Sequence, residues 1–171
     1  NGNLRRYPIV GIPTLGMSVD ICAGRVWAAT AYRSATDKAR DSDVFLTSRT
    51  IGGGAAQALM TSTADDRRVR DVTVSCVGGD LIAIGWLQRS DGKSSARLMI
   101  RSVEPLGSTP AIKQVFDLGR AELGSGLDVA STPSSVAVGF IRDGDLRIKR
   151  YTIGDDNSIA EIPLKTIAWN D

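Results

Sequence analysis

Two aspartates, Asp20 and Asp128, stand at corresponding places in two similar stretches of this 171-residue chain. Glycosidases hold two carboxylates roughly 5–10 Å apart, one as an acid and the other as a base or nucleophile. If both side chains line one channel, they could bind or cleave a sugar. Thr73 interrupts the set in the stretch between them, and simple polar lining of the channel is the alternative.

The stretch SRTIGGGAAQALM (residues 48–60) contains a glycine triplet, which raises the possibility of a phosphate-binding loop. A Walker loop needs a Lys and a hydroxyl after its last glycine, whereas Ala55, Ala56 and Gln57 follow here. A dinucleotide-binding loop needs a helix after the glycines, whereas a strand is expected here. We therefore predict a hairpin turn, in which the glycines supply the positive φ angles.

The chain contains no histidine, and this excludes several kinds of active site. A Ser–His–Asp triad, a Cys–His dyad and a His-ligated zinc ion all need an imidazole. The two cysteines, Cys22 and Cys76, are too few for a metal-ligand cluster, so we expect no metal and no cofactor. Tyr151 and Glu161 are a conceivable nucleophile and activating base, although a tyrosine on an alternating strand usually packs in a core.

The charges of the chain are nearly balanced, with 21 Lys and Arg against 19 Asp and Glu, a formal net charge of +2. No strong electrostatic field results, so nucleic acid is not an expected partner. The apolar runs are much shorter than the roughly 20 residues that cross a bilayer, so no membrane span is expected. The start NGNLRRYPIV has no Met and no signal-like segment, which we interpret as a processed or excised N-terminus.

Short strands separated by Gly, Pro, Ser and Asp clusters must position these residues. The runs RVWAATAYR, DLIAIGWLQR and SVAVGFIRD place Tyr32, Trp86 and Phe140 at equal intervals of 54 residues. One further strand precedes each run and two follow it. Four strands repeated three times predict an all-β fold, a β-propeller of four-stranded antiparallel blades. A sandwich is the alternative, although it would not need this period.

The blades are expected at 16–63, 70–120 and 124–169 of a single domain over 1–171. Residues 4–15 would form a strand of a preceding or closing blade. Known propellers close with about four to eight blades. Three blades alone would leave two apolar faces in water, where large apolar patches seldom remain. The expected partners are therefore further blades, from another chain or from a second copy of this one.

Cys22 and Cys76 lie on the first strands of adjacent repeats, and the third repeat has Ser131 at this place. A disulfide needs Cα atoms within about 7 Å, which neighbouring blades reach only near the propeller axis. The even count and the processed N-terminus favour an oxidising compartment, with a secreted, periplasmic or cell-surface location. Two buried thiols are the alternative.

Residues 11–54 resemble the first blade of the sialidase-like (Asp-box) β-propellers. The pair Ile12–Pro13 matches the Arg-Ile-Pro motif that opens this blade, with Gly11 in place of the arginine. Arg33 matches the arginine that ends its second strand, and Asp37 lies about where its catalytic aspartate stands.

The turn that follows is similar to the Asp-box of the same family, with Thr50 for its serine and without its Asp and Trp. In the second blade, SDG at residues 90–92 is similar to this box but stands one hairpin too early. The resemblance implies an arginine cluster that clamps a substrate carboxylate, a tyrosine nucleophile activated by a glutamate, and an aspartate as acid and base. It would assign catalysis to Asp37, and substrate binding to Arg33 and Arg49.

Two functions follow from these observations, and the sequence leaves open whether the chain is an enzyme. The first is a non-catalytic propeller segment of a larger or oligomeric secreted or surface protein, whose loops bind a protein or a glycan. The missing motif residues and missing blades favour it. The alternative is part of a sialidase-like glycoside hydrolase whose other site residues lie on another chain or copy. Asp37 would then act with Arg33, Arg49, Asp20 and Asp128.

Overall fold

The structure is a computed structural model and describes residues 16–33, 42–53, 57–60, 68–78, 80–90, 92–103 and 113–163. This part of the chain contains twelve strands and no helix. Accordingly, none of its segments is a helix long and apolar enough to cross a membrane. The all-β class predicted from the sequence is confirmed.

The strands form three antiparallel sheets of four, each in chain order. The first sheet contains β1 (Gly16–Cys22), β2 (Arg25–Arg33), β3 (Ser42–Thr50) and β4 (Gln57–Met60). The second sheet contains β5 (Arg68–Gly78), β6 (Leu81–Ser90), β7 (Lys93–Ser102) and β8 (Lys113–Arg120). The third sheet contains β9 (Leu127–Thr132), β10 (Ser135–Arg142), β11 (Asp145–Ile153) and β12 (Ile159–Ile162).

Tight turns connect neighbouring strands where the sequence supplies residues that accept a positive φ. Ala23 and Gly24 have φ angles of 49° and 69° between β1 and β2, and Asp143 and Gly144 have 54° and 83° between β10 and β11. Two successive positive φ angles are those of a type I′ turn, whose twist matches that of the strands it joins. Each of these turns therefore fixes the register of its hairpin.

The glycine triplet lies where a hairpin was predicted. Gly52 and Gly53 have φ angles of 90° and 151°, and the strand β4 that follows pairs antiparallel with β3. No helix begins after these glycines in the described part of the chain, so a phosphate would find no helix N-terminus there. The hairpin prediction is confirmed.

The three sheets pack face to face through two separate apolar cores. The first sheet contributes Trp27, Ala29 and Leu46 to a core that it shares with Ile82 and Trp86 of the second sheet. On its other face the second sheet packs against the third, and that core holds the residues Val77, Ala83, Leu98, Val129, Val138, Phe140 and Tyr151. The second sheet is thus buried on both faces, whereas the first and third sheets each have one face without a neighbouring sheet.

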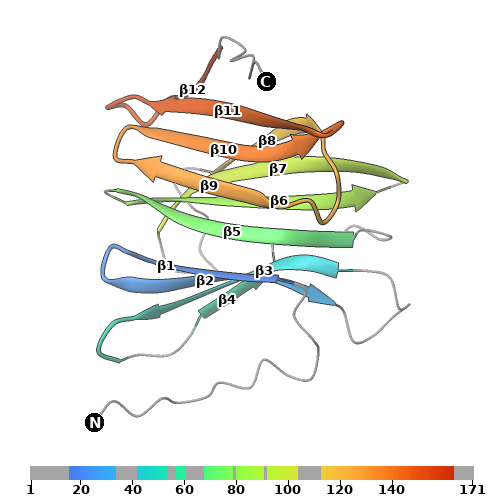
Figure 1. Cartoon of the computed structure of the whole chain (residues 1–171). Coiled ribbons are helices and arrows are strands. Elements are labelled where there is room, and N and C mark those ends of the chain that lie inside the picture. Colours follow the sequence, from blue (N-terminus) through green and yellow to red (C-terminus); the bar gives the residue numbers. More distant parts are fainter. Residues whose placement is uncertain are drawn as a thin grey trace.

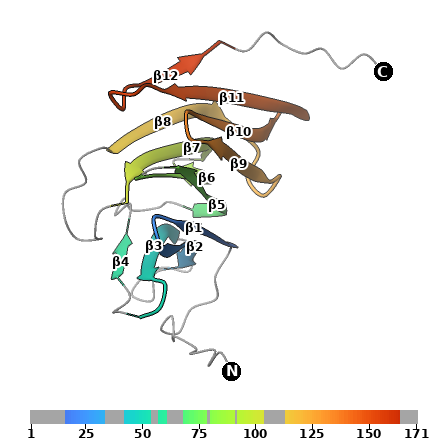
Figure 2. The same cartoon turned by 90° about the vertical axis from the view of Figure 1, so that its left-hand side faces the viewer.

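The first strands of the three sheets lie side by side, with β5 between β1 and β9 (Figure 1). The view turned by 90° places the outer strands β4 and β8 on the far side from these first strands (Figure 2). The sheets therefore stack in chain order around their first strands. The strands of each sheet begin and end close to the predicted ranges 16–63, 70–120 and 124–169. The predicted strand at 4–15 lies outside the described residues, and closure into a propeller stays a prediction.

Candidate functional site

The structure places Arg33 and Arg49 at opposite ends of the first sheet. Arg33 is the last residue of β2 and pairs with Ser42, whereas Arg49 pairs with Val26 near the start of that strand. The two pairs are seven residues apart along β2, or about 23 Å at the rise of a strand. A single site that clamps one carboxylate with both arginines does not fit this register. Asp37 lies outside the described residues.

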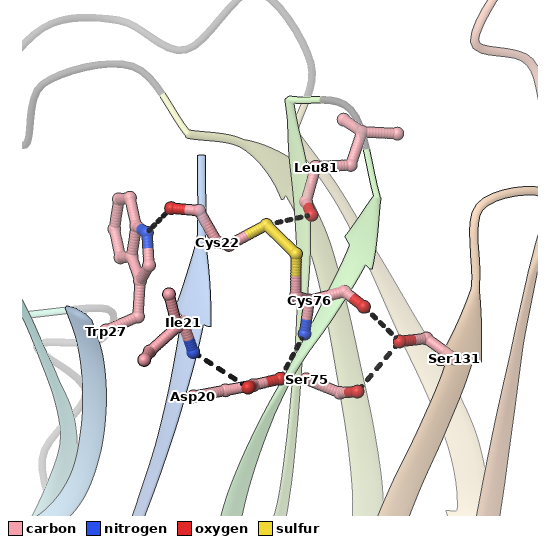
Figure 3. Close-up of a disulfide and its surroundings, with 8 residues drawn as sticks. All are labelled: Asp20, Ile21, Cys22, Trp27, Ser75, Cys76, Leu81 and Ser131. Atoms are coloured by element: carbon pink, nitrogen blue, oxygen red, sulfur yellow. Dashed lines mark hydrogen bonds between the residues drawn. A yellow bond between two sulfur atoms is a disulfide. The ribbon is translucent and has the colours of Figure 1, made fainter. Parts of the chain in front are cut away.

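Asp20 acts as a bridge between two sheets. Its Oδ1 atom accepts the N–H of Ile21 at 2.7 Å, and its Oδ2 atom accepts the N–H of Cys76 on β5, also at 2.7 Å (Figure 3). Both carboxylate oxygens are therefore occupied by backbone donors. This geometry accounts for Asp20 as a structural residue and leaves no oxygen directed at a substrate.

Asp128 does not lie beside Asp20. It stands four residues before the end of β9, whereas Asp20 stands two residues before the end of β1, and β5 separates the two strands. The Oδ1 atom of Asp128 accepts the N–H of Val129 at 2.9 Å. The two carboxylates therefore do not occupy corresponding positions, and the structure does not bring them together as a pair.

The structure joins Cys22 and Cys76 in a disulfide, with their Cα atoms 5.2 Å apart (Figure 3). The Sγ atom of Cys22 also lies 3.3 Å from the carbonyl oxygen of Leu81. This is a polar contact and not a hydrogen bond, because a disulfide sulfur carries no proton. On the other side of β5, the hydroxyl of Ser131 donates to the carbonyl oxygen of Cys76 and lies 2.7 Å from the hydroxyl of Ser75.

Tyr151 is a core residue and not a nucleophile. Its side chain is 1% exposed, and its ring centre lies 4.6 Å from that of Phe116. Burial, with a smaller contribution from the charge of Glu161, raises the pKa of Tyr151 to about 12. Glu161 is engaged elsewhere, since its Oε1 atom lies 3.0 Å from Nζ of Lys149. A phenol this hard to ionise is a poor nucleophile at neutral pH.

A polar groove of about 980 Å³ opens at one end of the second sheet, and the sequence did not identify it. The end of β6, the start of β7, the end of β8 and the connection to β9 form its walls. Charged residues from these elements line it: Lys93, Arg97, Asp117, Arg120 and Glu122. Gln88, Ser90, Ser94 and Ser95 add amide and hydroxyl groups. We refer to this cavity as the β7–β8 groove.

Backbone geometry fixes the shape of the β7–β8 groove. The register between β7 and β8 shifts at Ala96 and Arg97, which is the irregularity of a β-bulge. Gly119 has a φ of 97°, and its N–H donates to Oδ1 of Asp117 at 2.9 Å. The bulge therefore bends β8 beside the groove and turns its polar side chains to one place.

Hydrogen bonds hold two groove residues in position. Gln88 is only 4% exposed, and its Oε1 atom accepts the indole N–H of Trp86 at 3.1 Å. The Oε1 atom of Glu122 accepts the N–H of Gly144 at 2.8 Å, and the N–H of Glu122 donates to the carbonyl of Ile141 at 3.0 Å. Glu122 thereby ties the β10–β11 hairpin to the groove.

The cations of the β7–β8 groove are held only by exposed partners. Arg97 lies 3.4 Å from Asp117, and Arg120 lies 3.5 Å from Asp143; these carboxylates are 57% and 51% exposed. Within the described residues, Lys93 makes no ion pair. Surface ion pairs contribute about 0–1 kcal/mol, so an incoming anion can displace them at little cost.

A metal or cofactor finds no evident place here. No group of three or more Cys, Asp and Glu side chains that could hold a metal ion is present among the residues that the structure describes. The signal for the groove in the sequence was the run QRSDGKSSARL, which we compared only with the Asp-box turn. Its hydroxyl and basic side chains proved to be the informative feature, but their convergence with β8 depends on the bulge.

Comparison with known protein families, with curated proteins and with solved structures gives no match to this sequence. The resemblance to the sialidase-like propellers therefore stays a prediction that rests on the motif residues.

Proposed function

We propose that this chain is a non-catalytic segment of a β-propeller that binds a carboxylate-bearing glycan in the β7–β8 groove. Three successive four-stranded sheets, stacked around their first strands, are the arrangement expected of propeller blades. The groove lies at the end of the stack where β2, β6 and β10 finish, since these strands run in the same direction (Figure 1). Loops of a propeller at one end of the stack commonly form its binding surface.

The composition of the groove is the observation that carries this proposal. Arg97 and Arg120 offer forked donors that match a carboxylate, and Lys93 adds a third positive charge. Ser94, Ser95 and Gln88 can exchange hydrogen bonds with sugar hydroxyl groups. Small-molecule sites are mostly apolar, whereas this groove is mostly polar, which favours a saccharide.

Two observations support binding without catalysis. The raised pKa of Tyr151 and its burial argue against a tyrosine nucleophile. Asp20 is saturated by backbone donors and lies apart from Asp128, which argues against a carboxylate pair. The disulfide between Cys22 and Cys76 supports a secreted, periplasmic or cell-surface location, because such bonds persist in oxidising compartments.

The test is calorimetric titration with sialyllactose, with lactose as the matched ligand that lacks the carboxylate. We expect sialyllactose to bind at least tenfold more tightly than lactose, since a hydrogen bond to a charged group contributes about 1.5–3 kcal/mol. Chromatography of the incubated sialyllactose should show no release of lactose. Equal affinities would contradict the proposed ligand, and release of lactose would contradict a non-catalytic role.

Variants of the groove sharpen this test. Lys93→Ala with Arg120→Ala should weaken sialyllactose binding at least tenfold, because both changes remove cations from the groove wall. Lys149→Ala is the control, since this lysine lies on β11 and pairs with Glu161 outside the groove. An unchanged affinity in the double variant would place the ligand elsewhere.

A further inference from the structure

The first and third sheets each expose one face that lacks a neighbouring sheet. We call the face of a sheet that is directed at the next sheet in the chain its forward face, and the opposite one its backward face. The backward face of the first sheet carries Met17, Val19 and Ile21, which are 63%, 53% and 58% exposed. The forward face of the third sheet carries Leu146 and Ile148, which are 52% and 48% exposed. These are large apolar side chains in water, and both faces continue the direction in which the sheets stack.

The junctions inside the chain show what such faces contact. At the first junction, Ser18 and Asp20 on the forward face of β1 accept the N–H groups of Val74 and Cys76, at 3.1 Å and 2.7 Å. At the second junction, Ser75 on β5 contacts Ser131 on β9 with 2.7 Å between their hydroxyl oxygens. In each case short polar side chains of one first strand meet the next first strand 56 residues later.

The third sheet repeats this polar edge without a partner. Asp128, Ala130 and Thr132 alternate along β9 on the face away from β5. One oxygen of Asp128 accepts the N–H of Val129, just as one oxygen of Asp20 accepts the N–H of Ile21. The second oxygen of Asp20 reaches the next sheet, whereas that of Asp128 has no hydrogen-bond partner within the described residues.

A recess at the second junction receives the next sheet. A Cβ atom on Gly85 would lie 2.6 Å from Leu127 and 2.7 Å from Val129, so the missing side chain makes room for both residues. Gly139 stands at the same place 54 residues later, in β10 opposite Ile148. A Cβ atom there would meet only Leu146, at 3.7 Å. The recess is therefore repeated on the forward face of the third sheet, and nothing in the described part of the chain fills it.

The strand registers identify residues of the first sheet that match this recess. Leu127 and Val129 pair with the residues five and three positions after the start of β10. Met17 and Val19 pair with the residues five and three positions after the start of β2. Met17 and Val19 thus occupy on the first sheet the positions that Leu127 and Val129 occupy on the third.

We propose that a second copy of this chain docks head to tail, with Met17 and Val19 of its first sheet in the recess at Gly139. The contact continues the two junctions already present and needs no new kind of interface. In the same arrangement Asp128 accepts the backbone N–H of Val19 of the second copy, as Ser18 accepts that of Val74. The polar edge and the apolar recess are both satisfied.

Closure sets the number of copies. Head-to-tail contacts produce either a closed ring or an open filament. Known propellers contain about four to eight blades, and only six is a multiple of three within this range. If the sheets are propeller blades, as proposed above, two copies therefore close one six-bladed ring. The two docking contacts of this ring are equivalent, and no unpartnered sheet face remains.

The molar mass in solution tests the proposal. Light scattering of the eluted 171-residue protein should give twice the 18.2 kDa of one chain at micromolar concentration. Val19→Asp should shift the species to a monomer, because it places a charge in the recess. Val115→Asp is the matched control, since Val115 is equally exposed, at 51%, but lies on the outer strand β8. A wild-type monomer at all concentrations overturns the proposal, and so does a dimer that both variants retain.

Cross-linking tests the same contact without relying on a variant that might unfold. Ile21 and Thr132 occupy, across the proposed contact, the register positions of Cys76 and Cys22. Thr132→Cys mixed with Ile21→Cys under mild oxidation should give a covalent dimer on a non-reducing gel. Neither variant alone should do so. Absence of the dimer from the mixture overturns the proposal. A monomer that still distinguishes sialyllactose from lactose would overturn the second copy alone and leave the proposed function standing.

Discussion

Cys22 and Cys76 link the first strands of two neighbouring sheets through one disulfide, across 54 residues of chain. Closing a loop of this length lowers the entropy of the unfolded chain and corresponds to about 4 kcal/mol. We predict that the double variant Cys22→Ser with Cys76→Ser loses about 2–5 kcal/mol of unfolding free energy, measured by denaturant titration.

Reduction provides the control for this prediction. Dithiothreitol should lower the denaturation midpoint of the wild-type chain and should leave that of the double variant unchanged. A wild-type midpoint that does not respond to the reductant, once thiol counting shows the bond to be open, would contradict a stabilising role for the bridge.

Asp20 and Asp128 have different structural roles, and alanine substitutions should separate them. Asp20→Ala removes the acceptor for the N–H of Cys76 and leaves that donor unpaired between two sheets. Such a loss costs about 1–3 kcal/mol. In dilute solution, where copies of the chain are apart, Asp128→Ala removes only a bond within its own strand and should cost less. Equal losses of unfolding free energy in the two variants would contradict the bridging role of Asp20.

The buried phenol of Tyr151 predicts a loss of stability at high pH. Its pKa is about 12 in the folded chain, against a usual value of 10, so the unfolded chain releases this proton first as the pH rises. The contribution of Tyr151 to stability is complete below pH 10 and declines between pH 10 and about 12. The denaturation midpoint of Tyr151→Phe should fall less steeply across this range. Parallel curves for the variant and the wild-type chain would contradict the assignment.

The strands of this fold were predictable because their signals are local. The 54-residue spacing of Tyr32, Trp86 and Phe140 reflects the same place in three sheets, and the alternation of burial in β10 follows its sequence. The equivalence of Asp20 and Asp128 failed because the first strands do not share one register. In β5, shifts between Arg70 and Thr73 and between Cys76 and Gly78 displace the pairing. Bulges of this kind leave little trace in composition.

The candidate site was less predictable, because it depends on contacts between distant residues. Arg33 and Arg49 are close in the sequence, yet opposite ends of an antiparallel pair separate them. Arg97 and Asp117 meet in the groove only because β8 bends at the bulge beside Ala96. Glu122 reaches Gly144 through a turn whose position is set by the third sheet. Motif comparison addresses none of these relationships.

Mapping of a bound ligand by amide chemical shifts tests the proposed function most directly. Sialyllactose should shift the amide signals of Ser94, Ser95, Gly119 and Arg120 in the β7–β8 groove, and lactose should not. The amides of Ile21 and Thr50, near the opposite end of the first sheet, should stay unchanged. Shifts confined to that opposite end, or no shifts with sialyllactose at millimolar concentration, would contradict a carboxylate-binding groove.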